Sequence, residues 1–223
     1  MGTTLRSTMN LGVLGTGMVG NTIGSKLVQL GHSVKMGSRS AGNAKAVEWV
    51  MANGDHASQG TFADAASHGE IIFNCTSGTG SLQALGLAGA SNLRGKILVD
   101  IANALDFSKG MPPSLTVCNT DSLGEQIQRA FPDAFVVKAL NTVNCKLMVS
   151  PSIVPGDHDL FICGNDANSK DTVSQILQKW FGWKSVIDVG DITGARATEM
   201  LLPLWVRLMG KFQTPNFNFK IVR

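Results

Sequence analysis

Short apolar runs alternate with longer amphipathic runs along most of this chain. Residues 11–14 are apolar, and after a glycine-rich turn the stretch to Leu30 places apolar side chains at helical spacing. Gly31 then ends the expected helix, and residues 32–36 supply a second apolar run. The order of strand, helix and strand predicts a βαβ unit at the start of the chain.

The same alternation continues beyond this unit. Further strands are expected at residues 70–74, 95–101, 134–140, 159–163 and 185–189, and further helices at residues 44–51, 62–66, 81–87, 122–131, 168–181 and 193–209. Residues 141–157 lack periodicity and form a long loop of the kind that is often functional. We therefore predict an α/β fold: a Rossmann-type doubly wound parallel sheet with a small C-terminal α/β extension that ends in a long helix.

Gly15, Gly17 and Gly20 have the G-x-G-x-x-G spacing between the first strand and the first helix. Gly15 permits a sharp turn, Gly17 lets a pyrophosphate approach the backbone, and Gly20 allows close packing of helix and strand. The N-terminus of the helix favours an anion. The order of elements favours a dinucleotide site over a glycine-rich turn in another kind of α/β protein.

Ser38 and Arg39 follow the second strand, where such folds meet the adenosine ribose. NAD-binding folds usually place Asp or Glu there, whereas residues 21–47 contain no acidic residue. Arg39 can form charge-assisted bonds with a 2′-phosphate, and Ser38 adds a hydroxyl donor. A solvated surface arginine is the alternative, but this position favours NADP.

Composition narrows the class of protein. The chain has 223 residues, of which 43% are hydrophobic and 16% charged, as expected of a folded globular protein. The net charge of +3 includes no Lys/Arg run, which does not suggest nucleic-acid binding. No apolar stretch is long enough for a membrane helix, and residues 1–9 are expected to be a disordered leader. Four scattered cysteines suit a reduced, cytoplasmic protein, and the four histidines form no metal-ligand pattern.

Ligands of open α/β sheets bind beyond the carboxyl ends of the strands. The small, polar or amide residues that follow the later strands are Cys75, Thr76, Ser77, Gly78, Asn103, Asn141 and Cys145. They suit a crevice filled by a flat cofactor, with Thr76 and Ser77 along the nicotinamide ribose. Turn chemistry is an equally good explanation of the two asparagines.

A general acid or base is missing from this set. The chain has no tyrosine, and none of its histidines follows an expected strand. Lys138 is a candidate acid, but it lies inside an expected strand. Cys75 and Cys145 have no evident histidine partner, so packing explains these cysteines better than nucleophilic catalysis does. Hydride exchange between two cofactors needs mainly the apposition of two rings, and it fits this set better than alcohol oxidation.

Several later segments are similar to one family. With the glycine motif, these are residues 37–39, 99–103, 137–142, 163–167 and 188–205. Together they resemble the NADP oxidoreductases that work with the deazaflavin coenzyme F420, and the related oxidoreductase domain of the STEAP metalloreductases. The resemblance covers nearly the whole chain from Met9 onward.

The resemblance implies roles for individual residues. Thr16, Gly17, Met18 and Val19 would hold the pyrophosphate, Ser38 and Arg39 the 2′-phosphate, Thr76, Ser77 and Gly78 the nicotinamide half, and residues 141–145 the second cofactor. Archaeal members carry a histidine at the position of Asn141, so a flavin is an alternative to F420 as acceptor. A homodimer through the last helix is also expected from the family, although the apolar face of that helix could equally be core or a pocket wall.

The expected function is therefore hydride transfer between NADPH and a deazaflavin or flavin, without a catalytic side chain or a metal. Residues 9–150 would form the NADP-binding domain, and residues 151–223 would complete the sheet and the second-cofactor pocket. The alternatives are a non-catalytic NADP-binding regulatory protein and a small-molecule imine or carbonyl reductase, in which Lys138 would serve as the acid.

Overall fold

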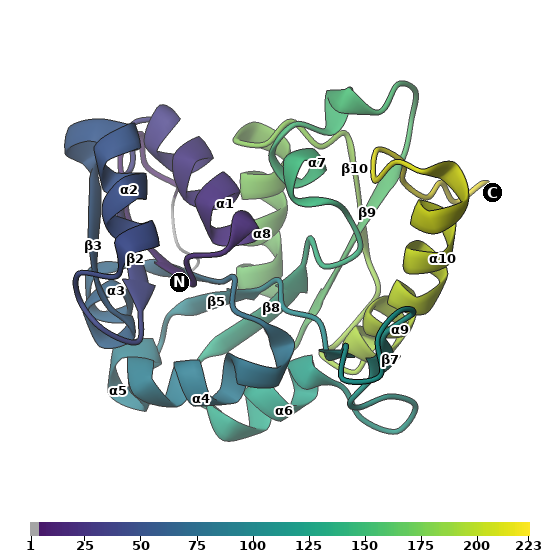
Figure 1. The fold of residues 1–223 in the computed structure, drawn as a ribbon, viewed down its shortest axis with the longest axis horizontal. Helices are drawn as coiled ribbons and strands as arrows, with labels where there is room; N and C mark the ends of the chain where they lie inside the picture. Colours follow the sequence, from purple (N-terminus) through teal and green to yellow (C-terminus); the bar gives the residue numbers. More distant parts are fainter. Residues whose placement is uncertain (1–4) are drawn as a thin grey trace.

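A computed structural model describes residues 5–223 and contains one eight-stranded sheet with helices on both faces (Figure 1). The strand order is β10-β9-β8-β5-β4-β1-β2-β3. The strands are β1 (Asn10–Leu14), β2 (Ser33–Ser38), β3 (Ala57–Thr61), β4 (Ile71–Asn74), β5 (Ile97–Asp100), β8 (Phe135–Ala139), β9 (Asp159–Gly164) and β10 (Ser185–Asp188). The predicted doubly wound fold is confirmed, because the chain leaves the central β1 in one direction through β2 and β3 and in the other through β4 and β5.

One strand pair departs from the predicted parallel sheet. β8 and β9 are antiparallel, while every other neighbouring pair in the large sheet is parallel. A parallel crossover usually needs a covering helix. The connection from β8 to β9 carries only the short helix α7 (Cys145–Val149) and a 3-10 turn at Pro151–Ile153. β9 and β10 nevertheless extend the same sheet, so the segment after residue 150 adds strands to it.

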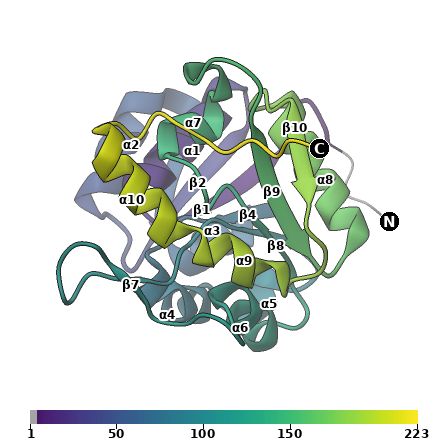
Figure 2. The same ribbon diagram turned by 90° about the vertical axis from the view of Figure 1, so that its right-hand side faces the viewer.

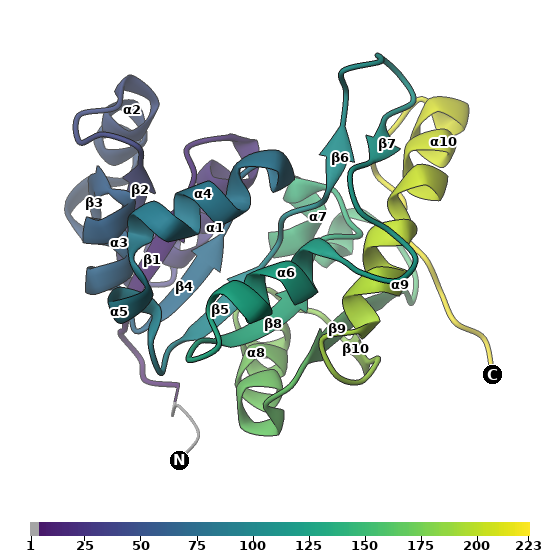
Figure 3. The same cartoon turned by 90° about the horizontal axis from the view of Figure 1, so that it is seen from below.

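Helices cover the sheet in two layers. They are α1 (Met18–Gln29), α2 (Ala44–Asn53), α3 (Phe62–His68), α4 (Gly78–Ala88), α5 (Ala90–Leu93), α6 (Leu123–Ala130), α7, α8 (Ala167–Lys179), α9 (Gly194–Met200) and α10 (Leu202–Phe212). Buried side chains of α1, α2, α7 and α8 share one core with the sheet. Those of α3, α4, α5 and α6 form the core on the other face, with α4 and α6 in front of the sheet in Figure 3.

Four features were not predicted from the periodicity. They are strand β3, helices α5 and α7, and a hairpin of β6 (Leu105–Asp106) and β7 (Ser114–Leu115). The helix expected at residues 193–209 is instead two helices, α9 and α10, that meet at Leu201. Pro203 lies in the first turn of α10, where its missing N–H costs no hydrogen bond.

Both ends of the described chain pack on the sheet. Met9 is buried, and Arg6 forms an ion pair with Glu70, so the expected disordered leader is wrong for residues 5–9. That expectation also covers residues 1–4, which lie outside the described part of the chain. After α10 the C-terminal tail returns to β9, where Asp159 N donates to Phe219 O at 2.9 Å (Figure 2).

Candidate functional site

The loop between β1 and α1 brings the three glycines to the point where the sheet winds in both directions. Gly15 has φ +114°, and a Cβ there would lie 2.7 Å from Cys75 O. A Cβ on Gly20 would collide with Gly15 O, whereas a Cβ on Gly17 would meet no atom within 4 Å. Two glycines are therefore required by the fold, while Gly17 borders open space, as the pyrophosphate interpretation expects.

Helix α1 begins directly after this loop. Gly17 is its N-cap and provides no side-chain hydrogen bond, and the first turn contains no acidic residue. Met18 at the first position is 80% exposed. The helix therefore presents its N-terminal N–H groups and partial positive charge without a carboxylate of the chain to neutralise them.

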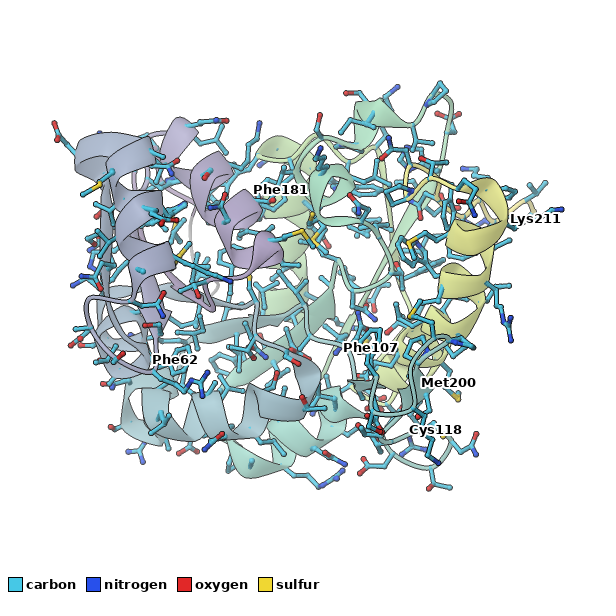
Figure 4. The ribbon with its side chains drawn as sticks, viewed as in Figure 1. Phe62, Phe107, Cys118, Phe181, Met200 and Lys211 are labelled. Atoms are coloured by element: carbon cyan, nitrogen blue, oxygen red, sulfur yellow. The ribbon has the colours of Figure 1, made fainter. Side chains whose placement is uncertain are left out.

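Arg39 lies at the carboxyl end of β2, close to the loop after β4. It lines a cavity of about 250 Å³ together with Phe62, Thr76 and Ser77, and Phe62 is labelled on α3 in Figure 4. Arg39 is exposed and forms no ion pair or hydrogen bond with the rest of residues 5–223. The guanidinium is therefore available to an anionic ligand.

Ser38 is placed differently from the expectation. Its side chain is buried, and Oγ donates to Ser40 O at 2.6 Å. The hydroxyl thus stabilises the loop that carries Arg39. A role as donor to a 2′-phosphate would require this bond to be given up.

A second cavity continues the first one along the carboxyl ends of β4 and β5. It has a volume of about 220 Å³ and shares Thr76 and Ser77 with the Arg39 cavity. The residues that line it are Val19, Cys75, Thr76, Ser77, Gly78, Ile101, Ala102, Asn103, Leu105 and Phe107. We call the two cavities together the carboxyl-end groove, with an Arg39 end and an Asn103 end.

Phe107, which is labelled in Figure 4, lines the Asn103 end of the groove. Phe107 follows β6 and is 55% exposed. Figures 1 and 3 show the β6–β7 hairpin next to the C-terminal helices in both views. The hairpin, which the sequence did not predict, therefore contributes an aromatic wall to the groove.

Asn103 and Asn141 form a pair of amides across the ends of β5 and β8. Asn103 Nδ2 donates to Asn141 O at 2.8 Å, and Asn141 Nδ2 donates to Asn103 Oδ1 at 3.0 Å. Asn141 Oδ1 is buried without a hydrogen-bond partner among the described residues. The preceding Leu140 is buried at φ +63°, a left-handed conformation that costs free energy for a non-glycine residue. Asn141 itself lines neither cavity of the groove.

Cys145 lies apart from the groove. It lines another cavity, of about 580 Å³, with Thr16, Gly17 and Met18. The glycine loop therefore borders the Cys145 cavity, while Val19 in the first turn of α1 borders the groove. Cys145 lies near the expected pyrophosphate position rather than beside Asn103.

Lys138 does not face the groove, contrary to its interpretation as a candidate acid. Its ammonium is fully buried and lies 2.8 Å from Asp100 Oδ2 and 2.8 Å from Glu199 Oε1. Burial alone would lower the pKa of Lys138, but the two carboxylates outweigh burial and raise the pKa. The lysine is therefore held as a structural cation.

The other titratable candidates give the groove no proton-exchanging group. Burial, reinforced by the charge of Asp100, raises the pKa of the Cys75 thiol well above its usual range. None of the four histidines lines either cavity of the groove. Residues 5–223 contain no group of three or more His, Cys, Asp or Glu side chains that could hold a metal ion. Across the same residues, no helix is long and apolar enough to cross a membrane.

The sequence did not identify the hydrogen-bond network around Lys138. Asn74, Asp100 and Lys138 are register partners on three neighbouring strands, and each is a polar residue at or near the end of an apolar strand. That repeated pattern was a usable signal. The participation of Glu199 had no local signal, because it comes from a distant helix.

Comparison with known proteins agrees with this fold and identifies the family. The family model described as "NADP oxidoreductase coenzyme F420-dependent" matches residues 10–104. A crystal structure from Arthrobacter sp. FB24, provisionally assigned as an F420-dependent NADP reductase, is 52% identical and has a TM-score of 0.91. The match covers 96% of this chain and all of that one.

Two curated proteins are more distant. Metalloreductase STEAP3 of Rattus norvegicus is 31% identical over 203 residues, which are 87% of this chain and 37% of the rat protein. F420-dependent NADP reductase of Methanocaldococcus jannaschii is 29% identical over 130 residues, 58% of this chain and 57% of the archaeal protein. This chain thus matches only 37% and 57% of the lengths of these two proteins. With its fold, its glycine loop and a full-length relative at 52% identity, the chain belongs to the family of coenzyme F420-dependent NADP oxidoreductases.

Proposed function

We propose that the chain binds NADP(H) along the carboxyl-end groove. Arg39 binds the 2′-phosphate, and the backbone from Gly15 to Val19 binds the pyrophosphate at the start of α1. Thr76 and Ser77 lie where the two cavities meet and Gly78 lines the second one, so the nicotinamide half would continue toward Asn103. The observation that carries the proposal is the unpaired Arg39 at one end of a groove whose other end is lined by Val19, at the start of α1.

The proposed reaction is hydride transfer between the nicotinamide and a second ring, a deazaflavin or a flavin. Arg39 is the one charged residue among those that line the groove, and the remainder carry hydroxyl, amide, thiol or apolar groups. Such a site can bind and orient two rings and exclude water, and it needs no protein acid or base. When a hydride leaves NADPH, the acceptor gains two electrons with one hydrogen, and any further proton comes from water.

The acceptor is proposed from the family and from the shape of the site. The relative from Methanocaldococcus jannaschii is named for F420, which supports a deazaflavin. The exposed ring of Phe107 and the helices of residues 151–223 would border the second cofactor. Residues 9–150 would then be the NADP-binding part, and a homodimer through α10 remains part of the proposal.

The decisive test follows NADPH absorbance with F420, FMN and FAD supplied in turn, beside a direct measurement of NADPH affinity. We expect tight NADPH binding and turnover with one acceptor. Tight binding without turnover would favour a non-catalytic NADP-binding regulator. The buried position of Lys138 argues against an imine or carbonyl reductase that uses this lysine as its acid.

A further inference from the structure

A row of buried polar side chains crosses the sheet next to the groove. Asn74 of β4, Asp100 of β5 and Lys138 of β8 are register partners. Asn74 Nδ2 donates to Asp100 Oδ1 at 2.8 Å, and Lys138 Nζ donates to Asp100 Oδ2 at 2.8 Å. Glu199 of α9 completes the row, with Oε1 2.8 Å from Lys138 Nζ. We call these four residues the strand-end network.

The hydrogen bonds identify the charge of each member. Besides Lys138, Asp100 accepts from Asn74 Nδ2 and from Ala102 N. Glu199 accepts from Lys138 and from the backbone N–H groups of Leu123 and Gly124 at 2.9 and 3.0 Å. Each carboxyl group is surrounded only by donors, which is the environment of an ionised carboxylate.

Lys138 is saturated as an ammonium. Its three donors reach Asp100, Glu199 and the carbonyl oxygen of Ala102, the last at 2.5 Å. Two carboxylates and one ammonium leave the strand-end network with one net negative charge. The N-terminus of α6 stabilises part of this charge through Leu123 and Gly124.

This charge lies one hydrogen bond behind the wall of the groove. Ala102 lines the Asn103 end, and it binds Asp100 through its N–H and Lys138 through its carbonyl. Thr76 lines both cavities, and its N–H and hydroxyl donate to Asn74 Oδ1 at 3.3 and 2.6 Å. Because the network is buried, water screens its field at the groove only weakly.

Building on the proposed NADP(H) site, we propose that the strand-end network favours the oxidised nicotinamide over the reduced one at the Asn103 end. The oxidised ring carries a positive charge and the dihydronicotinamide is neutral, while the phosphates are the same in both cofactors. A negative charge behind the ring therefore stabilises NADP⁺ relative to NADPH. The network thus assists the departure of a hydride from NADPH, and its members are positioning residues that do not touch the reacting atoms.

Two further charged residues near the network pair with each other. Arg196 of α9 binds Glu125 of α6 at 2.8 and 2.5 Å, and the Arg196 side chain is 36% exposed. This pair is neutral as a whole, and Arg196 is partly open to solvent while Glu125 is buried. It offers a control at the same helix contact.

The test is the ratio of the dissociation constants of NADP⁺ and NADPH, measured by direct titration of the whole protein. Glu199→Gln removes one negative charge and keeps an oxygen that can accept from Lys138. We expect the ratio to rise by about 3- to 10-fold, because NADP⁺ loses affinity and NADPH does not. Glu125→Gln, the matched control, should leave the ratio within about twofold, because Glu125 is bonded to Ser122 and Arg196, and neither residue lines the groove.

An unchanged ratio in a folded Glu199→Gln protein would overturn the proposal, as would an equal change in Glu125→Gln. Asp100→Asn removes the same charge from another position and must shift the ratio in the same direction, so the test does not depend on one variant that might unfold. Failure of the proposed function has a different signature, because the wild-type protein would then bind neither nucleotide.

Discussion

In the proposed site, Arg39 would discriminate between NADP(H) and NAD(H), because it is the unpaired cation at its end of the groove. Replacing Arg39 with alanine should weaken NADPH binding by about 1.5–3 kcal/mol, the range for hydrogen bonds to a charged group. NADH, which lacks the 2′-phosphate, should bind nearly as before. Titration of both nucleotides checks this, with Arg94→Ala as the control, since Arg94 pairs with Asp133 on the surface. Equal losses for both cofactors would refute the assignment.

Asn141 offers a buried acceptor, Oδ1, that has no partner within the described chain. Its amide nitrogen is already bonded to Asn103, which lines the groove. If the nicotinamide carboxamide reaches past Asn103 and donates to this oxygen, which lies outside both cavities, the protein should bind NADP⁺ more tightly than its 3-acetylpyridine analogue, which lacks the amide N–H. We expect Asn141→Ala to reduce this preference by about 2- to 10-fold, the worth of one net hydrogen bond.

The preference is a ratio within one protein preparation, so a partly destabilised variant still gives a valid measurement. Asn168→Ala, an exposed asparagine on α8, is the matched control and should retain the wild-type preference. If Asn141→Ala kept the wild-type preference for NADP⁺ over the 3-acetylpyridine analogue, Asn141 Oδ1 would not contact the carboxamide.

Individual site residues differ in how well the sequence could predict them. The glycines and Arg39 have fixed positions relative to one strand–helix–strand unit, so local spacing was sufficient to place them. The sequence left Lys138 open as a candidate acid, because its partners, Asp100 and Glu199, come from a neighbouring strand and a distant helix. Side-chain direction at the end of a strand depends on such contacts, which periodicity does not contain.

At the scale of elements, the β1–α1 turn combines a fold requirement with a binding function. Gly17 has open space where a Cβ would lie, so Gly17→Val should fold normally and lose affinity for NADP⁺ and NADPH alike. Gly20→Ala should show the opposite behaviour, because its Cβ would collide with Gly15 O and cost about 1–3 kcal/mol of stability. Thermal unfolding and nucleotide titration of both variants separate the two roles. A Gly17→Val protein that binds normally would contradict the pyrophosphate site.

The elements that the sequence missed are those with weak or misleading periodicity. Strand β3 reads Ala-Ser-Gln-Gly-Thr at the edge of the sheet, so it lacks the apolar run that marks the central strands. The short strands of the β6–β7 hairpin have two residues each, too few for a pattern to appear. The division of the last helix could have been predicted from the sequence, because proline is common in the first turn of a helix and Pro203 occupies that position in α10.

For the whole molecule, the winding of the sheet brings separate segments to one edge. The loops after β2, β4 and β5 meet the start of α1 at the groove, because β1 and β4 are neighbours. This followed from the predicted alternation of strands and helices. The same alternation could not predict the antiparallel β9 or the return of the C-terminal tail to Asp159, because each depends on long-range pairing.

Global stability should depend on pH through His32. Its ring is buried against Trp180, with a centroid distance of 4.2 Å, and neither ring nitrogen has a hydrogen-bond partner in the described chain. Burial lowers the pKa of His32 below its usual 6.5, so the folded state binds the proton less well than the unfolded state. The stability that neutral His32 contributes is fully present above the pKa of this histidine in the unfolded state. It is lost as the pH falls from that pKa toward the lower pKa of the folded state.

Replacing His32 with phenylalanine keeps an aromatic ring beside Trp180 and removes the titration. We expect the free energy of unfolding, measured in urea at about pH 8 and about pH 5, to fall less on acidification in His32→Phe than in the wild-type protein. The exposed His56 is the matched site, and His56→Phe should keep the wild-type difference between the two pH values. An identical difference in all three proteins would show that protonation of His32 does not oppose folding, and the acid sensitivity would then come from carboxylates such as Asp121. The guanidinium of Arg129 holds the pKa of that carboxyl at about 2.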